Sequence, residues 1–197
     1  MKKSFSLYRF ATALVLLLSP LVVTANESDW AKFLNSPTET THKTLLQDLK
    51  KCKNVTRCKE APSSEAVVKL VKLVETKNSY AVDVAFLSRH LHLLDGGNLE
   101  DVNRALGRLA ESDPTLLLSH LKKYRVSGRS FDSTLVMLPL ETVDDVGAKR
   151  RTMQKRIDSL STVSDQSLAR ERDNAILVLK RKLAKLQSEN KGTQPDK

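Results

Sequence analysis

Helix-capping and turn signals recur at short intervals along this chain, and the apolar residues between them fall three or four positions apart. This spacing places apolar side chains on one face of an α-helix, whereas a half-buried strand requires strict alternation. Lys69 and Lys72 interrupt the alternation in the segment richest in β-branched residues. The pattern therefore predicts an all-α fold, either an irregular helical bundle or a short α-solenoid-like stack of helix pairs that ends in a long antiparallel helical hairpin.

Capping residues followed by proline or an acidic residue mark the expected helix starts. Ser36-Pro37-Thr38-Glu39 predicts one start, with Ser36 as the cap. Pro62-Ser63-Ser64-Glu65 predicts another, and the apolar residues within 66–74 indicate a helix that is buried on most sides. Further signals are the expected caps Ser79, Asn98 and Asp113-Pro114, and the expected helix stop Gly96-Gly97.

The spacing of these starts is typical of stacked helical repeats such as HEAT or TPR arrays, because Ser64 and Asn98 are 34 residues apart. The two halves nevertheless share little residue-by-residue similarity, and the TPR signature residues are absent. Residues 131–138 fit either a short buried helix or an extended linker. Beyond them, apolar stripes within 143–160 and 168–186 predict two long antiparallel helices whose seams face each other.

The first 25 residues have the features of an export signal. A basic start is followed by an apolar run from Ala11 to Leu18, far shorter than the roughly 20 residues that cross a bilayer, and by the small-residue pattern Val23-Thr24-Ala25. We therefore expect cleavage near Ala25 and a periplasmic or secreted protein without a transmembrane segment. The expected divisions are a signal peptide at 1–25, one helical domain at 26–188 with a basic hairpin at 142–187, and a disordered tail at 189–197.

Two cysteines, Cys52 and Cys58, follow the export signal. In an oxidising compartment an isolated pair of this kind most simply forms one disulfide. Redox catalysis normally uses two intervening residues and a zinc site uses four ligands, and the chain has neither pattern. We therefore expect a structural disulfide that ties the end of one helix to the loop after it.

Positive charge is concentrated near the C-terminus. Residues 26–147 carry 17 basic and 17 acidic side chains, whereas residues 148–186 carry 11 basic and four acidic ones. Such a segment either forms a well-solvated helix pair or attracts an anionic partner, which outside the cytoplasm is an acidic protein or an anionic envelope polymer or lipid surface rather than nucleic acid. The residues expected to bind this partner are Lys149, Arg150, Arg151, Lys155, Arg156, Arg170, Arg172, Lys180, Arg181, Lys182 and Lys185.

No group of residues predicts catalysis, a metal site or a cofactor. His90 and His92 are two residues apart and lie on opposite faces of a helix, whereas a helical metal site needs ligands three or four apart. Ser127-Gly128-Arg129-Ser130 resembles a small anion-binding loop, although such a loop after a helix is usually a helix stop. The carboxylates available to a glycosidase are Glu100, Asp101, Glu141, Asp144 and Asp145, of which all but Glu141 also fit the first turn of a helix.

The sequence therefore predicts a non-catalytic, exported helical protein that binds an acidic partner protein or an anionic envelope component through its basic C-terminal hairpin. One alternative is a peptidoglycan-directed hydrolase that uses helix-borne carboxylates. The other is a structural subunit of an envelope assembly, in which the apolar seam of the hairpin is shared between chains.

Overall fold

The computed structural model describes residues 27–52, Cys58 and residues 61–191. Within these ranges the chain is helical between short loops and contains no strand, which confirms the predicted all-α class. The α-helices are α1 (Asp29–Asn35), α2 (Glu39–Lys51), α3 (Ser64–Glu75), α4 (Ser79–His90), α5 (Gly96–Ser112), α6 (Pro114–Lys123), α7 (Gly128–Val136), α8 (Val146–Ser161) and α9 (Ala169–Lys191). Two short 3₁₀ helices, η2 (Leu140–Thr142) and η3 (Gln166–Leu168), precede α8 and α9.

Two predicted segments fall largely outside the described residues. The expected signal peptide, residues 1–25, lies wholly outside them, as do residues 192–197 of the expected tail. Helix α9 extends to Lys191, so residues 189–191 continue this helix instead of beginning the tail.

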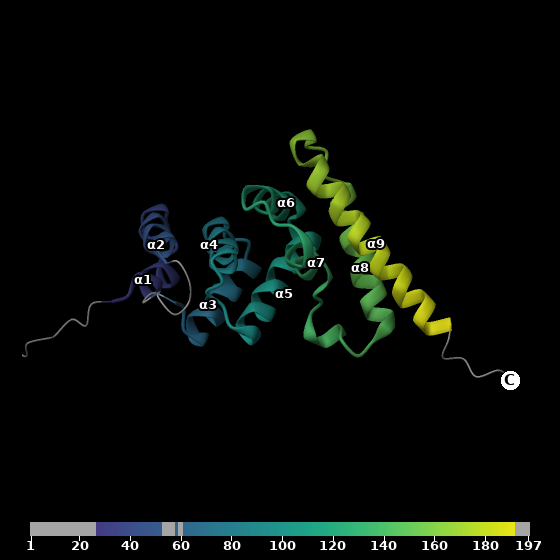
Figure 1. The fold of residues 1–197 in the computed structure, drawn as a ribbon, viewed down its shortest axis with the longest axis horizontal. Helices are drawn as coiled ribbons and strands as arrows, with labels where there is room; N and C mark the ends of the chain where they lie inside the picture. The colour runs from purple at the N-terminus through teal and green to yellow at the C-terminus, as the bar shows by residue number, and fades with distance from the viewer. Residues whose placement is uncertain (1–26, 53–57, 59–60, 192–197) are drawn as a thin grey trace, which may run out of the picture.

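The helices form two rows along the long axis of the molecule (Figure 1). Helices α1, α3 and α5 contact one another in turn in one row, and α2, α4 and α6 do so in the other. Helix α7 packs against α5 and α9, and the α8–α9 hairpin closes the end of both rows through contacts with α5 and α6. The architecture is thus a short stack of helix pairs that ends in an antiparallel hairpin.

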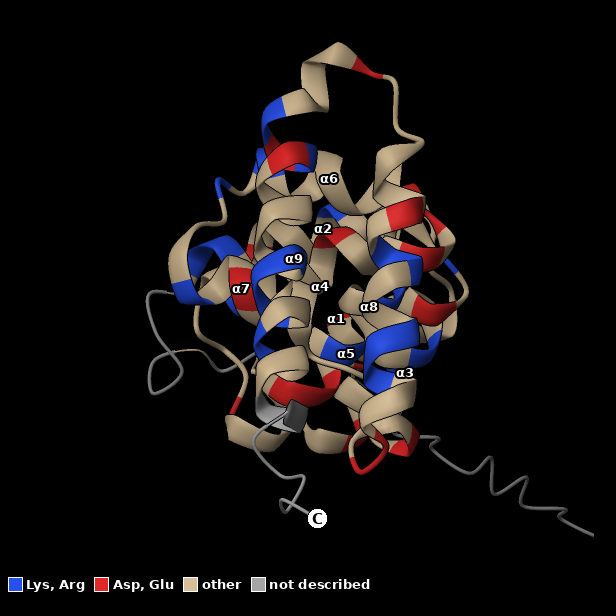
Figure 2. Cartoon of the chain, turned by 90° about the vertical axis from the view of Figure 1, so that its right-hand side faces the viewer, with Lys and Arg blue, Asp and Glu red and all other residues tan. Residues whose placement is uncertain are grey.

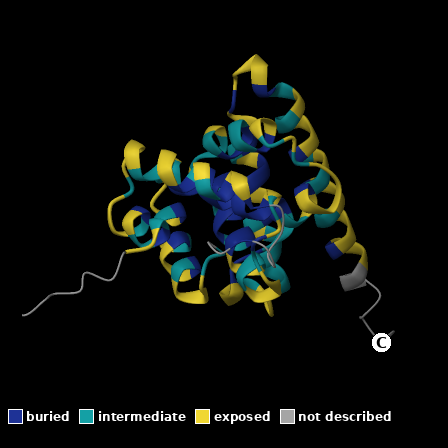
Figure 3. Ribbon diagram, turned by 60° about the vertical axis from the view of Figure 1, so that its left-hand side comes forward, coloured by how far each residue is buried: buried dark blue, intermediate teal, exposed yellow. Residues whose placement is uncertain are grey.

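One apolar core runs between the rows, and the exposed residues lie around it (Figure 3). Helix α5 illustrates how the sequence builds this core. Its residues Val102, Leu106 and Leu109 recur at helical spacing and all are buried. Each such side chain contributes about 1.5–3 kcal/mol relative to an exposed position, so the repeated stripe is enough to hold the helix in its row.

Helix α3 presents one face to the core, which corrects the prediction that it is buried on most sides. Val67, Leu70 and Val74 are buried, whereas Val68 is 51% exposed. Neighbouring helices α1, α4 and α5 cover the buried stripe, and the remaining face stays in solvent. The run of β-branched apolar residues in α3 therefore predicted a larger buried surface than the neighbouring helices cover.

The predicted helix starts are correct at α3 and α6 and displaced at α2, α4 and α5. Helix α3 begins at Ser64 and is capped by Ser63, within the predicted start at residues 62–65. Asp113 caps α6 with Pro114 in the first helical position, as predicted. Helix α2 begins after Thr38 rather than Ser36, because Thr38 takes part in a reciprocal capping box. Helix α4 begins after Asn78, one residue before the expected cap.

Gly96 and Gly97 begin α5 and do not end α4, which corrects a second prediction. The Asp95 side chain accepts a hydrogen bond of 2.9 Å from the Asn98 N–H and caps α5, so the expected cap Asn98 lies inside the helix. Helix α4 stops earlier, at His90, and is followed by a turn that needs no glycine.

Three helices end in the same turn, with a non-glycine residue in the left-handed region. Lys77 (φ 62°) follows α3, His92 (φ 56°) follows α4 and Arg125 (φ 47°) follows α6. In each case the N–H of this left-handed residue and the N–H of the residue after it donate to carbonyls of the last helical turn, the pattern of a Schellman motif. Because basic side chains occupy the position that glycine usually takes, glycine did not indicate where these helices end.

Two further segments resolve as follows. Residues 131–138, for which a helix and an extended linker were both possible, belong to α7 as far as Val136.

Cys52 and Cys58 form the predicted disulfide, with their Cα atoms 4.8 Å apart. This bridge ties the end of α2 to the segment before α3 and contributes about 2 kcal/mol by restricting the unfolded chain.

Candidate functional site

The basic hairpin predicted as the binding surface is formed by α8 and α9, which pack antiparallel at the end of the stack (Figure 2). Its seam is filled from within the chain: Ile157 and Leu160 of α8 and Ala175 and Leu179 of α9 are all buried. In Figure 2, which faces this end of the molecule, Lys and Arg positions are spread along both α8 and α9.

Arg156 is not part of that surface, which corrects its assignment as a partner-binding residue. Its side chain is fully buried; Nε donates to Glu111 Oε1 at 3.1 Å, and Nη1 donates to the carbonyls of Leu135 (2.6 Å) and Met137 (3.0 Å). Burial lowers the pKa of the guanidinium, although the Glu111 carboxylate opposes that shift. Arg156 therefore joins α8 to α5 and α7 and is inaccessible to a partner.

Four other basic residues of the hairpin are engaged within the chain. Arg150 Nη2 donates to the Leu186 carbonyl at 3.0 Å, and Arg172 Nη1 donates to the Val163 carbonyl at 2.8 Å, so both tie the hairpin together. Two further residues form ion pairs, Arg151 with Asp145 and Lys155 with Glu111. The remaining predicted binding residues are at least partly exposed and comprise Lys149, Arg170, Lys180, Arg181, Lys182 and Lys185.

A groove of about 610 Å³, the α9 groove, lies between α9 and the α6–α7 connection. Helix α9 lines it with Arg170, Leu177 and Arg181, which share one helical face. Lys122 and Arg125 line the opposite side, while Glu171 is the one carboxylate in the described lining. Leu177 is 46% exposed, so the groove combines positive charge with accessible apolar surface.

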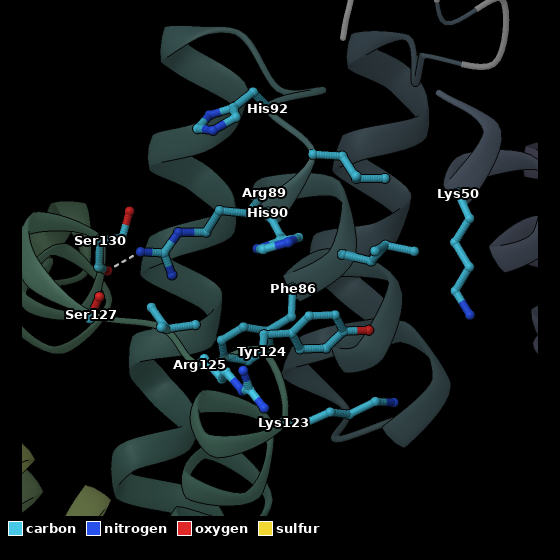
Figure 4. A pocket seen from close by; sticks show the side chains of 13 residues that line it. Lys50, Phe86, Arg89, His90, His92, Lys123, Tyr124, Arg125, Ser127 and Ser130 are labelled. Atoms are coloured by element: carbon cyan, nitrogen blue, oxygen red, sulfur yellow. Dashed lines mark hydrogen bonds between the residues drawn. The ribbon is translucent and has the colours of Figure 1, made fainter. Parts of the chain in front are cut away.

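A second cavity of about 740 Å³, the α4–α6 pocket, opens where the C-terminal ends of α4 and α6 meet the start of α7 and the end of α2. Tyr124 provides partly exposed aromatic surface in it, with the buried Phe86 stacked behind, and no carboxylate is among the described residues of its lining. Figure 4 shows Arg89 pointing toward Ser130 on one side, with Lys50 on the other. The basic and imidazole side chains that line the pocket are Lys50, Arg89, His90, His92, Lys123 and Arg125.

Arg89 is the buried cation of this pocket, with 8% of its surface exposed. Its guanidinium donates to the Thr134 hydroxyl and to the Ser130 carbonyl, both on α7. Burial lowers the pKa of Arg89 to about 10, which still leaves the side chain protonated at neutral pH. No carboxylate pairs with it within the described ranges.

A buried polar cluster around Asp83 borders this pocket and was not anticipated from the sequence. The Asp83 carboxylate accepts a hydrogen bond from Tyr124 OH at 2.9 Å, lies 3.0 Å from His42 Nε2 and pairs with Lys123. His120 Nε2 lies 3.5 Å from the same carboxylate. Burial alone would raise the pKa of Asp83, but the hydrogen bonds from His120, Lys123 and Tyr124 outweigh burial and hold it well below its usual range.

The Asp83 cluster has a structural role: it holds three helices together. Its groups come from α2, α4 and α6, and Asp83 is surrounded by donors that satisfy its oxygens. Burial and the neighbouring Asp83 carboxylate raise the pKa of Tyr124, so the phenol stays protonated and donates. The available sequence signal was an acidic residue between Val82 and Ala85 in an apolar helical run.

The remaining candidates for chemistry are dispersed. Glu100 and Asp101 both pair with Arg104, while Glu141 pairs with Arg108; all three carboxylates are exposed, and none lines either cavity. Across residues 27–52, 58 and 61–191, no group of three or more His, Cys, Asp or Glu residues is arranged to hold a metal ion. In the same part of the chain, no helix has the length and apolar character needed to cross a membrane.

Comparison with known proteins adds no family to this picture. No protein-family model, curated protein sequence or solved structure matches the chain.

Proposed function

We propose that this chain is a non-catalytic, exported interaction protein and that an acidic segment of a partner protein binds in the α9 groove. The observation that carries the proposal is the charge of the groove. Arg170 and Arg181 on α9 face Lys122 and Arg125 across it, against one carboxylate, Glu171. An acidic segment laid between these two sides gains favourable interactions from both.

The apolar part of the groove favours a polypeptide over a simple anionic polymer. Leu177 is accessible, and Leu121 and Val178 also line the groove. A polyphosphate offers charge but no apolar group to cover Leu177. A segment that alternates acidic and apolar residues satisfies both components, and apolar anchors supply most of the free energy in many interfaces.

Two features support export and the absence of catalysis. A disulfide between Cys52 and Cys58 is typical of proteins outside the cytoplasm. A glycosidase needs two carboxyl groups about 5–10 Å apart across one cleft, whereas none of the carboxylates considered for hydrolysis lines either cavity.

The class of partner is tested by measuring the affinity of the mature protein for three probes. These are a peptide of alternating Glu and Leu, polyphosphate, and vesicles that contain phosphatidylglycerol. We expect the Glu–Leu peptide to bind most tightly. Its affinity is expected to fall at least about tenfold between about 50 mM and 500 mM salt, because the Debye length is about 10 Å at 0.1 M and about 3 Å at 1 M.

Two results would contradict the proposal. Peptide affinity that does not change with salt would exclude electrostatic recognition. Tighter binding to polyphosphate or to the vesicles than to the Glu–Leu peptide would assign the groove to an envelope polymer or a lipid surface.

A further inference from the structure

The α4–α6 pocket has an unbalanced positive charge. Lys123 is neutralised by Asp83, but Lys50, Arg89 and Arg125 have no carboxylate partner within the described ranges. Together with the absence of acidic residues from the described lining, this leaves three permanent positive charges around one cavity. Such an arrangement raises the local concentration of anions.

Arg89 gives the pocket its most specific feature. A buried charge is costly unless opposite charge or several oxygens surround it, and the two acceptors of Arg89 are a neutral hydroxyl and a neutral carbonyl. A guanidinium has five N–H donors in a planar fork that matches the oxygens of phosphate and carboxylate groups. An anion in the pocket would therefore provide the opposite charge that Arg89 lacks.

Other groups of the pocket fit the rest of such a ligand. The volume of about 740 Å³ is within the range of small-molecule sites and far exceeds that of one inorganic ion. Tyr124 lies between Arg89 and Lys50 (Figure 4), and its ring is partly exposed, while Phe86 stacks against it at 5.9 Å between ring centroids and is itself buried. Ser127 and Ser130, at the start of α7, add hydroxyl groups to the same lining.

We propose that the α4–α6 pocket binds a small molecule that carries a phosphomonoester and a ring. Three permanent cations, with no acidic residue in the described lining, favour a dianion and hence phosphate over a single carboxylate. The partly exposed ring of Tyr124 holds the ring of the ligand by stacking. This site is independent of the α9 groove except for its three shared lining residues, Arg125, Val126 and Ser127.

Isothermal titration calorimetry of the mature protein at neutral pH tests this proposal with phenyl phosphate, inorganic phosphate, benzoate and benzyl alcohol. Phenyl phosphate is expected to bind most tightly, and neutral benzyl alcohol is expected not to bind. Benzoate that binds as tightly as phenyl phosphate would overturn the preference for a dianion. Binding to phosphatidic acid vesicles without binding to phenyl phosphate would overturn the proposal of a soluble ligand.

Variants locate the site. Lys50→Gln is expected to weaken phenyl phosphate binding about fivefold, as is usual for the loss of one partly exposed charge. Lys43→Gln, also on α2 but paired with Glu39, is the charge-matched control and should leave the affinity unchanged. Equal affinities in the Lys50→Gln, Lys43→Gln and unaltered proteins would refute the assignment.

Two further variants separate this inference from the proposed function. Arg89→Gln should abolish measurable binding of phenyl phosphate if circular dichroism shows that the variant is folded; retained binding would contradict the role of Arg89. The double variant Arg170→Gln/Arg181→Gln should keep phenyl phosphate binding while losing affinity for the Glu–Leu peptide. Loss of both ligands in the folded double variant would show that the pocket is not a separate site.

Discussion

Two buried arginines from different helices hold α7 in place. Arg89 on α4 donates to Thr134 and to the carbonyl of Ser130, and Arg156 on α8 donates to the carbonyl of Leu135. A guanidinium is suited to this task because its donors form a rigid fork and its charge persists when it is buried. A helix of nine residues, too short to be stable alone, is thereby fixed between its neighbours.

Replacement of Arg156 tests this role. Arg156→Met should lower the free energy of unfolding by about 2–3 kcal/mol, because the carbonyls of Leu135 and Met137 lose their donor and Glu111 loses its buried partner. Arg151→Met on the same helix, which removes an exposed pair, should cost less than about 1 kcal/mol. Urea denaturation measures both values; equal losses would show that Arg156 has no special structural role.

Gly107 makes the close approach of α5 and α7 possible. A Cβ atom there would lie 2.7 Å from the Thr134 carbonyl and 3.1 Å from Arg156 Nη1. Gly107→Ala is therefore expected to reduce stability by about 1–3 kcal/mol, despite the better helix propensity of alanine. Gly97→Ala, near the start of the same helix and with nothing within 4 Å of its added Cβ, should be neutral or stabilising by up to about 1 kcal/mol. Thermal unfolding of the two variants would refute this account if Gly107→Ala were the more stable.

Single charged residues within apolar stripes were the residues whose burial was hardest to predict from the sequence. Arg156 lies three residues after Met153 and four before Leu160, which is the spacing of the buried stripe itself. Because the side chain is charged, the sequence nevertheless predicted a surface position for Arg156. Asp83 and Arg89 follow the same logic on α4, where every residue from Ala81 to Arg89 is buried. An ionisable residue at a core position indicates a buried polar contact, but the sequence does not identify its partner.

At the scale of elements, the Asp83 cluster connects the second row. The carboxylate on α4 is held by His42 from α2 and by Tyr124 and Lys123 from α6, so one side chain links three helices. A buried polar cluster of this kind stabilises the fold only if every polar group has a hydrogen-bond partner. Removal of one group leaves the others buried without partners.

Acid should weaken this link. Because the pKa of Asp83 is lower in the folded protein than its usual value of about 3.9, the carboxylate stabilises the fold fully above that value, and the contribution is lost as the pH falls toward the lower folded pKa. Unfolding free energies between about pH 2 and pH 5 should therefore fall more steeply for the unaltered protein than for Asp83→Asn. Parallel pH profiles of the two proteins would show that Asp83 is not the source of acid sensitivity.

Helix types were predictable from the sequence, but helix ends were less so. The Asp113-Pro114 start is local, since the cap and the proline act on the turn that follows them. The end of α4 depends on a Schellman turn at His92, where a basic residue takes a conformation usually given to glycine. Packing of Leu93 into the core accompanies that turn and is not visible in local sequence.

At the scale of the molecule, the two candidate sites lie on one continuous surface. The α9 groove and the α4–α6 pocket share Arg125, Val126 and Ser127 at the α6–α7 connection. Neither cavity was predictable as a whole, because each combines residues from segments that are distant in sequence. The excess of basic residues after Ala148 predicted the C-terminal half of this surface but not the contribution of α4 and α6.

The most direct test of the account compares two charge-matched double variants in binding to the Glu–Leu peptide. Arg170→Gln/Arg181→Gln removes two charges from the α9 groove, and Arg151→Gln/Lys155→Gln removes two from α8 outside it. The account predicts that the groove variant binds about 5- to 30-fold more weakly, as expected for the loss of two charge contacts, and that the α8 variant stays within about twofold of the unaltered protein. Equal affinities of the two variants would contradict the claim that the α9 groove is the binding site.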